Sequence, residues 1–361
     1  MKPQSEAELA GLIRDAERPF VIVGGGTRSI GEIEGEVLST VALKGIELYE
    51  PGALTLVARA GTPLDEVEAA LAKEGQRLPF EVPDYRKLFG RIGESTIGGV
   101  VAANASGPRR VQAGACRDSL IGIRMVTGQG EVIKNGGRVM KNVTGYDLVK
   151  LMAGSWGTLG VLTEVSFKVL PVPEAHATLV LTGLDNSAAV AAMSSALGSP
   201  FEVNGAAHIP GEGTFLRIEG FRASVSYRSE QLRKHLASHG NVEIREGGGL
   251  WSSIRDIGPF HGKSGDIWRI AIRPSDAPTM AERLNAEQVY FDWGGGLIFV
   301  LAEPGTDLRN RMGSFEGHAT RIRGRGEGAF HPEPPAVAAL TRGLRAKFDP
   351  RGLFNAGLMG A

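Results

Sequence analysis

Residues 24–29 have the composition of a loop that binds an anion through its backbone. The segment consists of Gly24, Gly25, Gly26, Thr27, Arg28 and Ser29, and it follows the apolar run 20–23, which predicts a short buried strand. Glycine allows successive N–H groups to turn toward one point, so such a loop suits a diphosphate. The dinucleotide fingerprint needs glycine in place of Ser29, and a P-loop needs lysine in place of Glu32, so neither pattern is present. An ordinary glycine-rich turn is the alternative interpretation.

Two further segments are rich in small residues. Residues 94–110 have almost no large side chains before Arg109, so a flat ligand could lie against their main chain, with Arg110 or Arg117 supplying positive charge. Close packing of a helix on a sheet is the alternative. Residues 154–162 predict a turn between a helix and a strand, and Ser155 is no nucleophile elbow because Ala153 stands where that motif needs glycine.

Composition excludes several other classes of site. Cys116 is the only cysteine of 361 residues, which excludes a disulfide framework, a structural zinc cluster and an iron–sulfur centre on this chain. His235 and His239 are one helical turn apart, but Leu236 replaces the glutamate of a zincin, so we expect no metal site. The 40 basic residues balance the 40 acidic ones, so we expect no nucleic-acid partner. We also expect neither a secretory signal nor a membrane span, since no apolar run approaches about twenty residues.

Local patterns predict the elements that position these segments. Ser5 begins a helix that stops before Pro19, and Thr62 is expected to cap a second helix that ends at Gly75. Residues 121–133 predict a hairpin, and residues 161–170 a strand. In that strand, one face is expected to carry Val161, Thr163, Val165, Phe167 and Val169.

The order of these elements predicts an α+β protein of two domains. We place a first domain over residues 1–172, where glycine is dense, and a second α+β domain over residues 173–330. A C-terminal helix and tail, residues 331–361, are expected to pack back on the first domain. We find no internal repeat in the sequence.

Together, the three small-residue segments resemble the FAD-binding domain of the vanillyl-alcohol oxidase and p-cresol methylhydroxylase (PCMH) family. Residues 60–64, 106–110, 139–147 and 348–355 narrow the resemblance to the FAD-binding E subunits of bacterial glycolate oxidase, and it extends over the second domain through residues 251–255, 268–269, 293–295 and 317–320. Residues 84–93 look inserted, and Ala356 stands where the family has proline. The resemblance implies a PCMH-type domain of two α+β subdomains, a smaller α+β cap domain, and a C-terminal segment that returns to the flavin.

The resemblance also implies which residues surround FAD. Residues 24–29 would hold the diphosphate, and the adenine would meet Gly160, Val161 and Leu162. The ribityl chain and the ring would lie among Thr96, Ile97, Gly98, Gly99, Ala103, Ser106, Gly107, Arg110, Gly114 and Asp118. Asn355 is either a contact of the ring or a plain turn residue. No His or Cys stands among residues 27–29, where some members tether the flavin, so we expect noncovalent FAD.

The implied chemistry is oxidation of a small 2-hydroxy acid such as glycolate, which needs a base for the hydroxyl proton and a clamp for the carboxylate. His318 is the candidate base. Arg321 and Arg323 are the candidate clamp, because residues 321, 323 and 325 are expected on one strand face. A structural histidine and a solvated basic strand are the alternatives.

Electrons are expected to leave through partners, because a single cysteine holds no iron–sulfur cluster. The resemblance implies a second FAD-domain subunit and an iron–sulfur subunit in one glycolate oxidase complex. The expected location is the cytoplasm, with any peripheral membrane attachment made through those partners. Two other functions stay open: a flavin-holding assembly subunit without substrate chemistry, and a free-standing D-lactate-type dehydrogenase that uses FAD.

Overall fold

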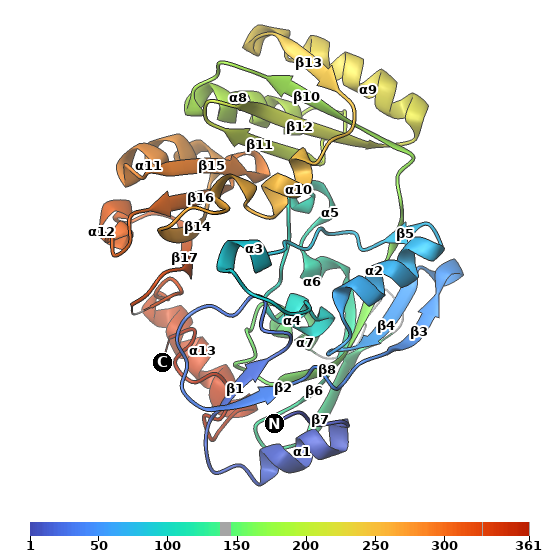
Figure 1. The fold of residues 1–361 in the computed structure, drawn as a ribbon, viewed down its shortest axis with the longest axis vertical. Coiled ribbons are helices and arrows are strands. Elements are labelled where there is room, and N and C mark those ends of the chain that lie inside the picture. Colours follow the sequence, from blue (N-terminus) through green and yellow to red (C-terminus); the bar gives the residue numbers. More distant parts are fainter. Residues whose placement is uncertain (138–145, 327, 361) are drawn as a thin grey trace. The chain divides into compact units, whose positions relative to one another are not determined.

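The structure, a computed structural model, describes residues 1–137, 146–326 and 328–360, and the chain divides into two compact units (Figure 1). Unit 1 comprises Met1–Ser106, Gly114–Val172 and Pro332–Ala361, and unit 2 comprises Gly107–Ala113 and Pro173–His331. Residues 139–145, which carry part of the resemblance, lie outside the described residues. No helix in the described ranges is long and apolar enough to cross a membrane.

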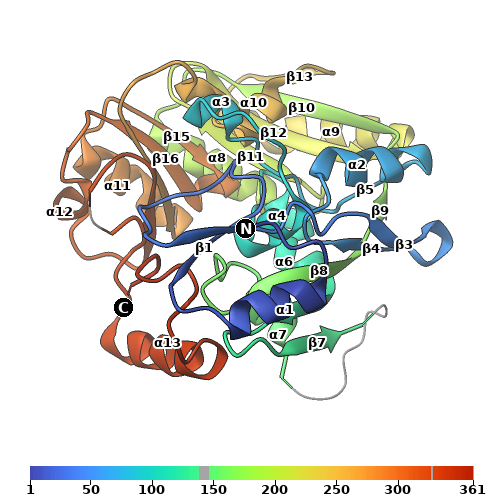
Figure 2. The ribbon, with the colours of Figure 1, turned by 60° about the horizontal axis from the view of Figure 1, so that its bottom comes forward.

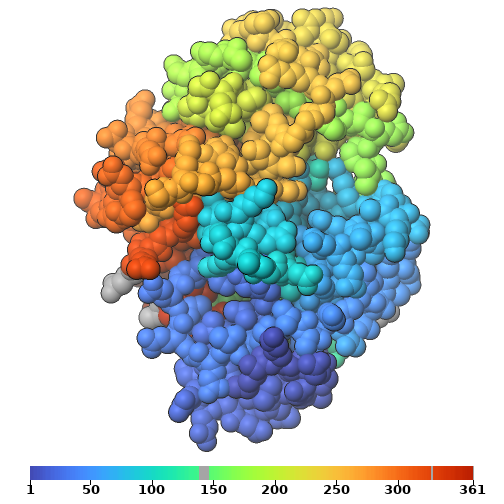
Figure 3. All heavy atoms as spheres, viewed as in Figure 1, coloured from blue at the N-terminus to red at the C-terminus, as the bar shows by residue number. Residues whose placement is uncertain are grey.

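The smaller part of unit 1 is a short parallel sheet covered by the first helix. Ser5 caps this helix by accepting the N–H of Glu8 at 3.1 Å, and the helix lies on the outside of the unit (Figures 2 and 3). Phe20 of the first strand also bridges Phe354 of the C-terminal tail, so the tail adds to this sheet. The elements are α1 (Glu6–Arg14), β1 (Phe20–Val23), β2 (Glu36–Ser39) and the tail after α13 (Pro335–Phe348).

The larger part of unit 1 is a five-stranded antiparallel sheet in the order β3-β4-β8-β6-β7, and helices α2, α4 and α7 share its apolar core. Its strands are β3 (Ile46–Glu50), β4 (Thr55–Arg59), β6 (Leu120–Val126), β7 (Val132–Gly136) and β8 (Val161–Lys168). Its longer helices are α2 (Leu64–Lys73), α4 (Ile97–Ala102) and α7 (Leu148–Met152). Smaller elements are β5 (Gln76–Arg77), β9 (Leu170–Pro171), α3 (Arg86–Phe89) and α6 (Cys116–Ser119).

Two local expectations for unit 1 were wrong. Thr62 does not cap α2; its hydroxyl donates to the carbonyl of Arg59 at 2.7 Å, and Pro63 takes the cap position. The regular alternation of β8 is also interrupted, because the pairing of β8 with β6 shifts register between Arg124 and Met125. As a result Val161 packs with the cluster around β1, whereas Leu162, Val165 and Phe167 pack with the large core.

The C-terminal tail is fastened to the smaller sheet by residues of the 348–355 motif. Asp349 accepts the N–H groups of Leu353 and Phe354 at 3.0 and 2.8 Å. Arg351 donates to the carbonyls of Gly128 and of residues at the end of α1. These contacts explain why a motif so far along the chain belongs to unit 1.

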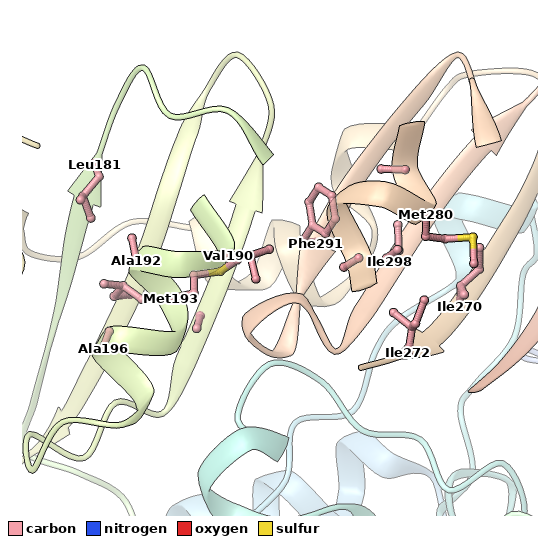
Figure 4. Close-up of a cluster of buried hydrophobic side chains, with 14 of the residues drawn as sticks. Leu181, Val190, Ala192, Met193, Ala196, Ile270, Ile272, Met280, Phe291 and Ile298 are labelled. Carbon is pink, nitrogen blue, oxygen red and sulfur yellow. The ribbon is translucent and has the colours of Figure 1, made fainter. Parts of the chain in front are cut away.

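Unit 2 is one eight-stranded antiparallel sheet whose helices α8, α9, α11 and α12 contribute to its apolar core (Figures 1 and 4). In Figure 4, Met193 and Val190 of α8 point toward the sheet, as does Met280 of α11. The strands are β10 (Ala175–Leu181), β11 (Gly205–Ile209), β12 (Gly213–Gly220), β13 (Val242–Arg245), β14 (Asp266–Ile272), β15 (Gln288–Asp292), β16 (Leu297–Ala302) and β17 (Gly317–Arg323). The helices are α5 (Arg110–Ala113), α8 (Asn186–Leu197), α9 (Arg222–His235), α10 (Leu250–Arg255), α11 (Ala277–Leu284) and α12 (Leu308–Met312).

The strand order shows a structural repeat that the sequence does not. The order is β13-β10-β12-β11-β15-β16-β14-β17, and each half follows the βαββαβ connection. The two halves meet where His208 of β11 pairs with Phe291 of β15. The expectation of no repeat therefore holds only for the sequence pattern and not for the fold.

Candidate functional site

The loop at residues 24–29 follows β1 and lines a cavity in unit 1. The cavity has a volume of about 220 Å³. Its walls come from β1 and the loop after it, from α4 with Thr96, from the turn and strand at residues 155–162, and from the C-terminal tail. All these segments belong to unit 1, so this unit contains the whole cavity.

Within the described ranges, none of the main-chain N–H groups of residues 24–29 donates a hydrogen bond to another residue. An anion with several acceptor oxygens would satisfy such a series of donors, and this is how glycine-rich loops bind phosphate groups. The loop is therefore equipped to hold a diphosphate without using a charged side chain.

Close packing explains why this loop consists of glycines. A Cβ atom at Gly25 would overlap the carbonyl oxygen of Glu94, and one at Gly24 would overlap the hydroxyl of Thr96. Gly26 has a φ of 71°, a left-handed backbone angle that residues with a Cβ rarely adopt. Thr96 in turn caps α4 by accepting the N–H of Gly99 at 3.3 Å. The loop at residues 24–29 thus packs directly on the start of the small-residue segment.

Most residues expected around the cofactor line the cavity. They are Gly24, Gly25, Gly26, Thr27, Arg28, Ser29, Thr96, Gly98, Gly99, Ala103, Gly160, Val161, Leu162 and Asn355. The side chain of Arg28 is buried and donates to the carbonyl of Pro83 at 2.6 Å, so it supports the loop from within the protein.

Other expected residues do not line this cavity. Ile97 is fully buried in the core of the larger sheet. Ser106 accepts the N–H of Cys116 at 3.0 Å, and Asp118 accepts that of Ala115 at 2.8 Å beside Gly114, so these residues shape the chain locally. Gly107 and Arg110 belong to unit 2.

Several lining residues were not predicted from the sequence, among them Thr40, Ala60, Ser155, Trp156 and Leu358. The Ser155 hydroxyl is buried and has no hydrogen-bond partner among the described residues. A buried polar atom without a partner is costly, so its place in the cavity wall fits a polar ligand. A signal for Ser155 was present in the sequence, since it lies in the segment 154–162, but Thr40 and Leu358 carry no local signal.

Asn355 joins three parts of the cavity wall. Its Oδ1 accepts the N–H of Ile22 at 2.7 Å, and its Nδ2 donates to the carbonyl of Trp156 at 2.7 Å. Both ends of the amide are therefore engaged by main chain, and the residue itself has a φ of 43°. The Asn355 amide therefore fastens the tail to β1 and to the turn at Trp156, within the lining of the cavity.

Unit 2 carries a cluster of arginines close to His318. The guanidinium carbons of Arg110 and Arg269 lie 4.4 and 4.9 Å from the ring centroid of Trp293. Arg269 pairs with Thr320 on β17, and His318 is two residues earlier, on the same face of the sheet. His318 is exposed on β17; desolvation by the groups around it, and then the charges of Arg269, His331 and Arg110, lower its pKa to about 4. Its imidazole is therefore neutral near pH 7 and able to accept a proton.

The structure does not bring Arg321 and Arg323 together with His318. Arg321 pairs with Trp268, whose side chain belongs to the apolar core, so it lies on the opposite face from His318. A register shift follows between Arg321 and Arg323, which breaks the expected alternation. Arg323 donates to the carbonyls of Gly265 and Lys263 at 2.9 and 2.7 Å.

Comparison with known proteins assigns the first part of the chain to a family and the whole chain to a fold. The family described as "FAD binding domain" matches residues 1–136. Solved structures of alkyldihydroxyacetonephosphate synthase align with a TM-score of 0.72 and 17% identity over 99% of this chain and 76% of theirs, a likeness of fold. The fold and the family match define a protein with a PCMH-type FAD-binding domain, so the predictions of an α+β fold and of FAD are confirmed.

A more specific relationship comes from full-length similarity. Glycolate oxidase subunit GlcE of Escherichia coli (strain K12) is 38% identical over 94% of this chain and 92% of its own length. The chain belongs to the GlcE family, which confirms the resemblance and the prediction of an FAD-dependent oxidoreductase. Partial relatives are glycolate oxidase subunit GlcD of Bacillus subtilis (strain 168), 40% identical over 49% of this chain and 33% of that protein, and D-lactate dehydrogenase of Anaerostipes hadrus, 35% identical over 44% and 31%.

Proposed function

We propose that this chain is the FAD-binding subunit of a glycolate-oxidising complex and that it takes part in the conversion of glycolate to glyoxylate. The observation that carries the proposal is the similarity to GlcE, because it extends through unit 2 and not only over the FAD-binding part. The cavity in unit 1, with its unused backbone donors and the Ser155 hydroxyl, supports the cofactor half of the proposal.

Bound FAD would supply the acceptor for the hydride that leaves the carbon bearing the hydroxyl group. The backbone of residues 24–29 would hold its diphosphate, and Gly160, Val161 and Leu162, which also line the cavity, would meet its adenine. His318 would accept the hydroxyl proton on a ring nitrogen, for which its low pKa keeps it neutral.

The substrate carboxylate needs a positive partner, and the cluster around Trp293 offers one. Arg110 and Arg269 both stack on Trp293, and both lie close enough to His318 to lower its pKa. We therefore assign the clamp to these arginines. Arg321 and Arg323 take structural roles in this proposal, because their guanidinium groups donate to main-chain carbonyls.

The proposal also includes partners that carry the electrons away. Cys116 is buried in the core of unit 1, and no cluster of metal-ligating side chains occurs among the described residues. A second FAD-domain subunit and an iron–sulfur subunit would provide the path that this chain lacks. Similarity to both GlcE and GlcD supports a complex of this kind.

Anaerobic addition of glycolate to the purified holoprotein tests the proposal. Bleaching of the flavin absorbance near 450 nm is expected if this chain is catalytic. Bleaching only after the partner subunits are added would favour the flavin-holding alternative. Faster bleaching by D-lactate than by glycolate, followed by full turnover with an artificial acceptor and no partner, would replace the proposal with the free-standing dehydrogenase.

A further inference from the structure

Residues 83–95 of unit 1, here called the strap, contain α3 and contact the loop at residues 24–29, here called the diphosphate loop. The loop residue Arg28 ties the two ends of the strap together, because its guanidinium donates both to the carbonyl of Pro83 at 2.6 Å and to the hydroxyl of Ser95. The strap is also braced internally, since Arg86 pairs with Asp84 at 2.8 Å and donates to the carbonyl of Gly93 at 3.2 Å. The strap is therefore held in one conformation, and its two ends are bonded to Arg28 of the loop.

A second arginine connects the strap to the turn of the loop. Arg91 Nη1 donates to the carbonyl oxygen of Gly26 at 3.1 Å, and its guanidinium carbon lies 4.8 Å from the ring centroid of Phe89. The side chain is half-buried, and burial lowers its pKa without removing its charge near neutral pH. The strap also fits closely against the loop, because there is no room for a Cβ between Gly25 and Glu94.

The contact from Arg91 to Gly26 sets the direction of the next N–H group. In a planar trans peptide, the carbonyl of Gly26 and the N–H of Thr27 point in opposite directions. Arg91 does not line the cavity, whereas Thr27 does. By holding the carbonyl on the strap side, Arg91 directs the Thr27 N–H toward the cavity side, where a diphosphate oxygen would accept it.

The Ser39 hydroxyl holds the carbonyl two residues earlier, since it donates to the carbonyl of Gly24 at 3.4 Å. That contact comes from β2, within the regular sheet, whereas the contact to Gly26 depends on a segment outside it. The backbone conformation at Gly26, the left-handed residue of the loop, therefore depends on the strap.

We propose that the strap holds the diphosphate loop in its FAD-binding conformation and that Arg91 is the positioning residue that directs the Thr27 N–H. Loss of this contact frees the Gly26 peptide to rotate, and the charge of Arg91 is lost beside an anionic ligand. The result is faster release of FAD from a protein that is otherwise folded. The proposal concerns cofactor retention, so it does not depend on which substrate is oxidised.

The test compares FAD release from the wild-type holoprotein and from the R91Q, R91K and K87Q holoproteins, followed by the rise in flavin fluorescence after dilution. Lys87 is the matched control, because it is an exposed cation of the same strap. We expect about tenfold faster release for R91Q, corresponding to about 1.4 kcal/mol, a smaller increase for R91K, and the wild-type rate for K87Q. The affinity of the FAD-free proteins for ADP should fall with R91Q, and the affinity for adenosine, which lacks a diphosphate, should not.

Three results would overturn the proposal: an unchanged release rate in R91Q, an equal acceleration in K87Q, or equal losses of affinity for ADP and adenosine. A lower unfolding temperature of FAD-free R91Q with unchanged release would assign Arg91 to general stability and would also count against it. If R91Q does not fold, R91K decides, with two- to threefold faster release expected and an unchanged rate contradicting the proposal. Failure of glycolate to reduce the flavin would affect the proposed function and leave this test intact.

Discussion

The residues that build the cofactor site act largely through the backbone they permit. Gly24 and Gly25 leave room for Thr96 and Glu94, and Gly26 supplies a left-handed turn. The N–H groups that result are donors for an anion that no side chain has to reach. Substitutions in this loop should therefore affect cofactor binding through geometry rather than charge.

Gly25→Ala tests whether the geometry of the loop decides the affinity for FAD. The new Cβ would overlap the carbonyl of Glu94, so the loop must shift, at a cost of about 2 kcal/mol, or roughly 30-fold in FAD affinity. FAD titration by thermal shift and fluorescence measures the change. Gly52→Ala is the control, since a Cβ there meets nothing within 4 Å, and its affinity should match the wild type. Equal affinities of G25A and wild type would argue against the observed loop conformation.

His318→Asn tests the proposed base. The rate of flavin reduction by glycolate should fall about 10²- to 10⁴-fold while the FAD content stays unchanged. Because the pKa of His318 is lowered to about 4, the wild-type rate should stay level as the pH falls from about 8 to about 5 and should decline only near pH 4. His239→Asn, in the 3-10 turn after α9, is the control, and glycolate should reduce its flavin at the wild-type rate. A wild-type rate for H318N would exclude His318 as the base.

At the scale of elements, the sheet of unit 2 depends on the junction between its two βαββαβ halves. His208 stands at this junction, buried, with its Nδ1 2.9 Å from the hydroxyl of Thr214 and its ring 5.9 Å from that of Phe291. Burial lowers its pKa to about 4 against the opposing influence of the Gly213 main chain and Asp185. The folded protein therefore holds His208 neutral where the unfolded chain would take up a proton.

This shift predicts a loss of stability in mild acid. The unfolded state begins to bind a proton at His208 below a pH of about 6.5, and the folded state only near pH 4, so stability falls as the pH drops through that window. Between about pH 8 and pH 5 the contribution of His208 should amount to about 2 kcal/mol. His208→Gln cannot titrate, so denaturant unfolding at both pH values should show a correspondingly smaller loss. The same loss in H208Q as in the wild type would contradict this assignment.

At the scale of the whole molecule, the FAD-binding unit is assembled from three stretches of chain. The tail returns to β1 after unit 2 has been completed, and Asn355 bonds to Ile22 across 333 positions of sequence. The cavity wall therefore requires both ends of the chain. Among the described residues that line it, none is a His, Cys or Tyr that could tether a flavin.

This composition predicts that FAD is dissociable. Precipitation of the holoprotein with acid should leave the yellow colour in the supernatant, and the flavin recovered there should be intact FAD by chromatography. By mass spectrometry, the precipitated protein should have the mass of the unmodified chain. Flavin absorbance that stays with the pellet would show a covalent bond and would contradict the prediction.

Features carried by local backbone chemistry could be predicted from the sequence. The glycine loop after β1, the cap at Ser5 and the stop at Gly75 depend on neighbours within a few residues. Thr62 shows where such reasoning failed, since its hydroxyl finds a partner in Arg59 instead of capping the helix. The alternation expected at 321 and 323 failed for a related reason, because a register shift is set by the partner strand and not by the strand itself.

The sequence by itself therefore determined the cofactor class, the family and the glycine loop after β1, because each depends on residue types in contiguous segments. Only the tertiary structure decided that Arg110 joins Arg269 and Trp293 in unit 2, that His318 and Arg321 face opposite sides of one sheet, and that Arg91 reaches Gly26. These relations depend on strand register and on contacts between segments far apart in the chain. Such contacts form only when burial of the two cores brings those segments together.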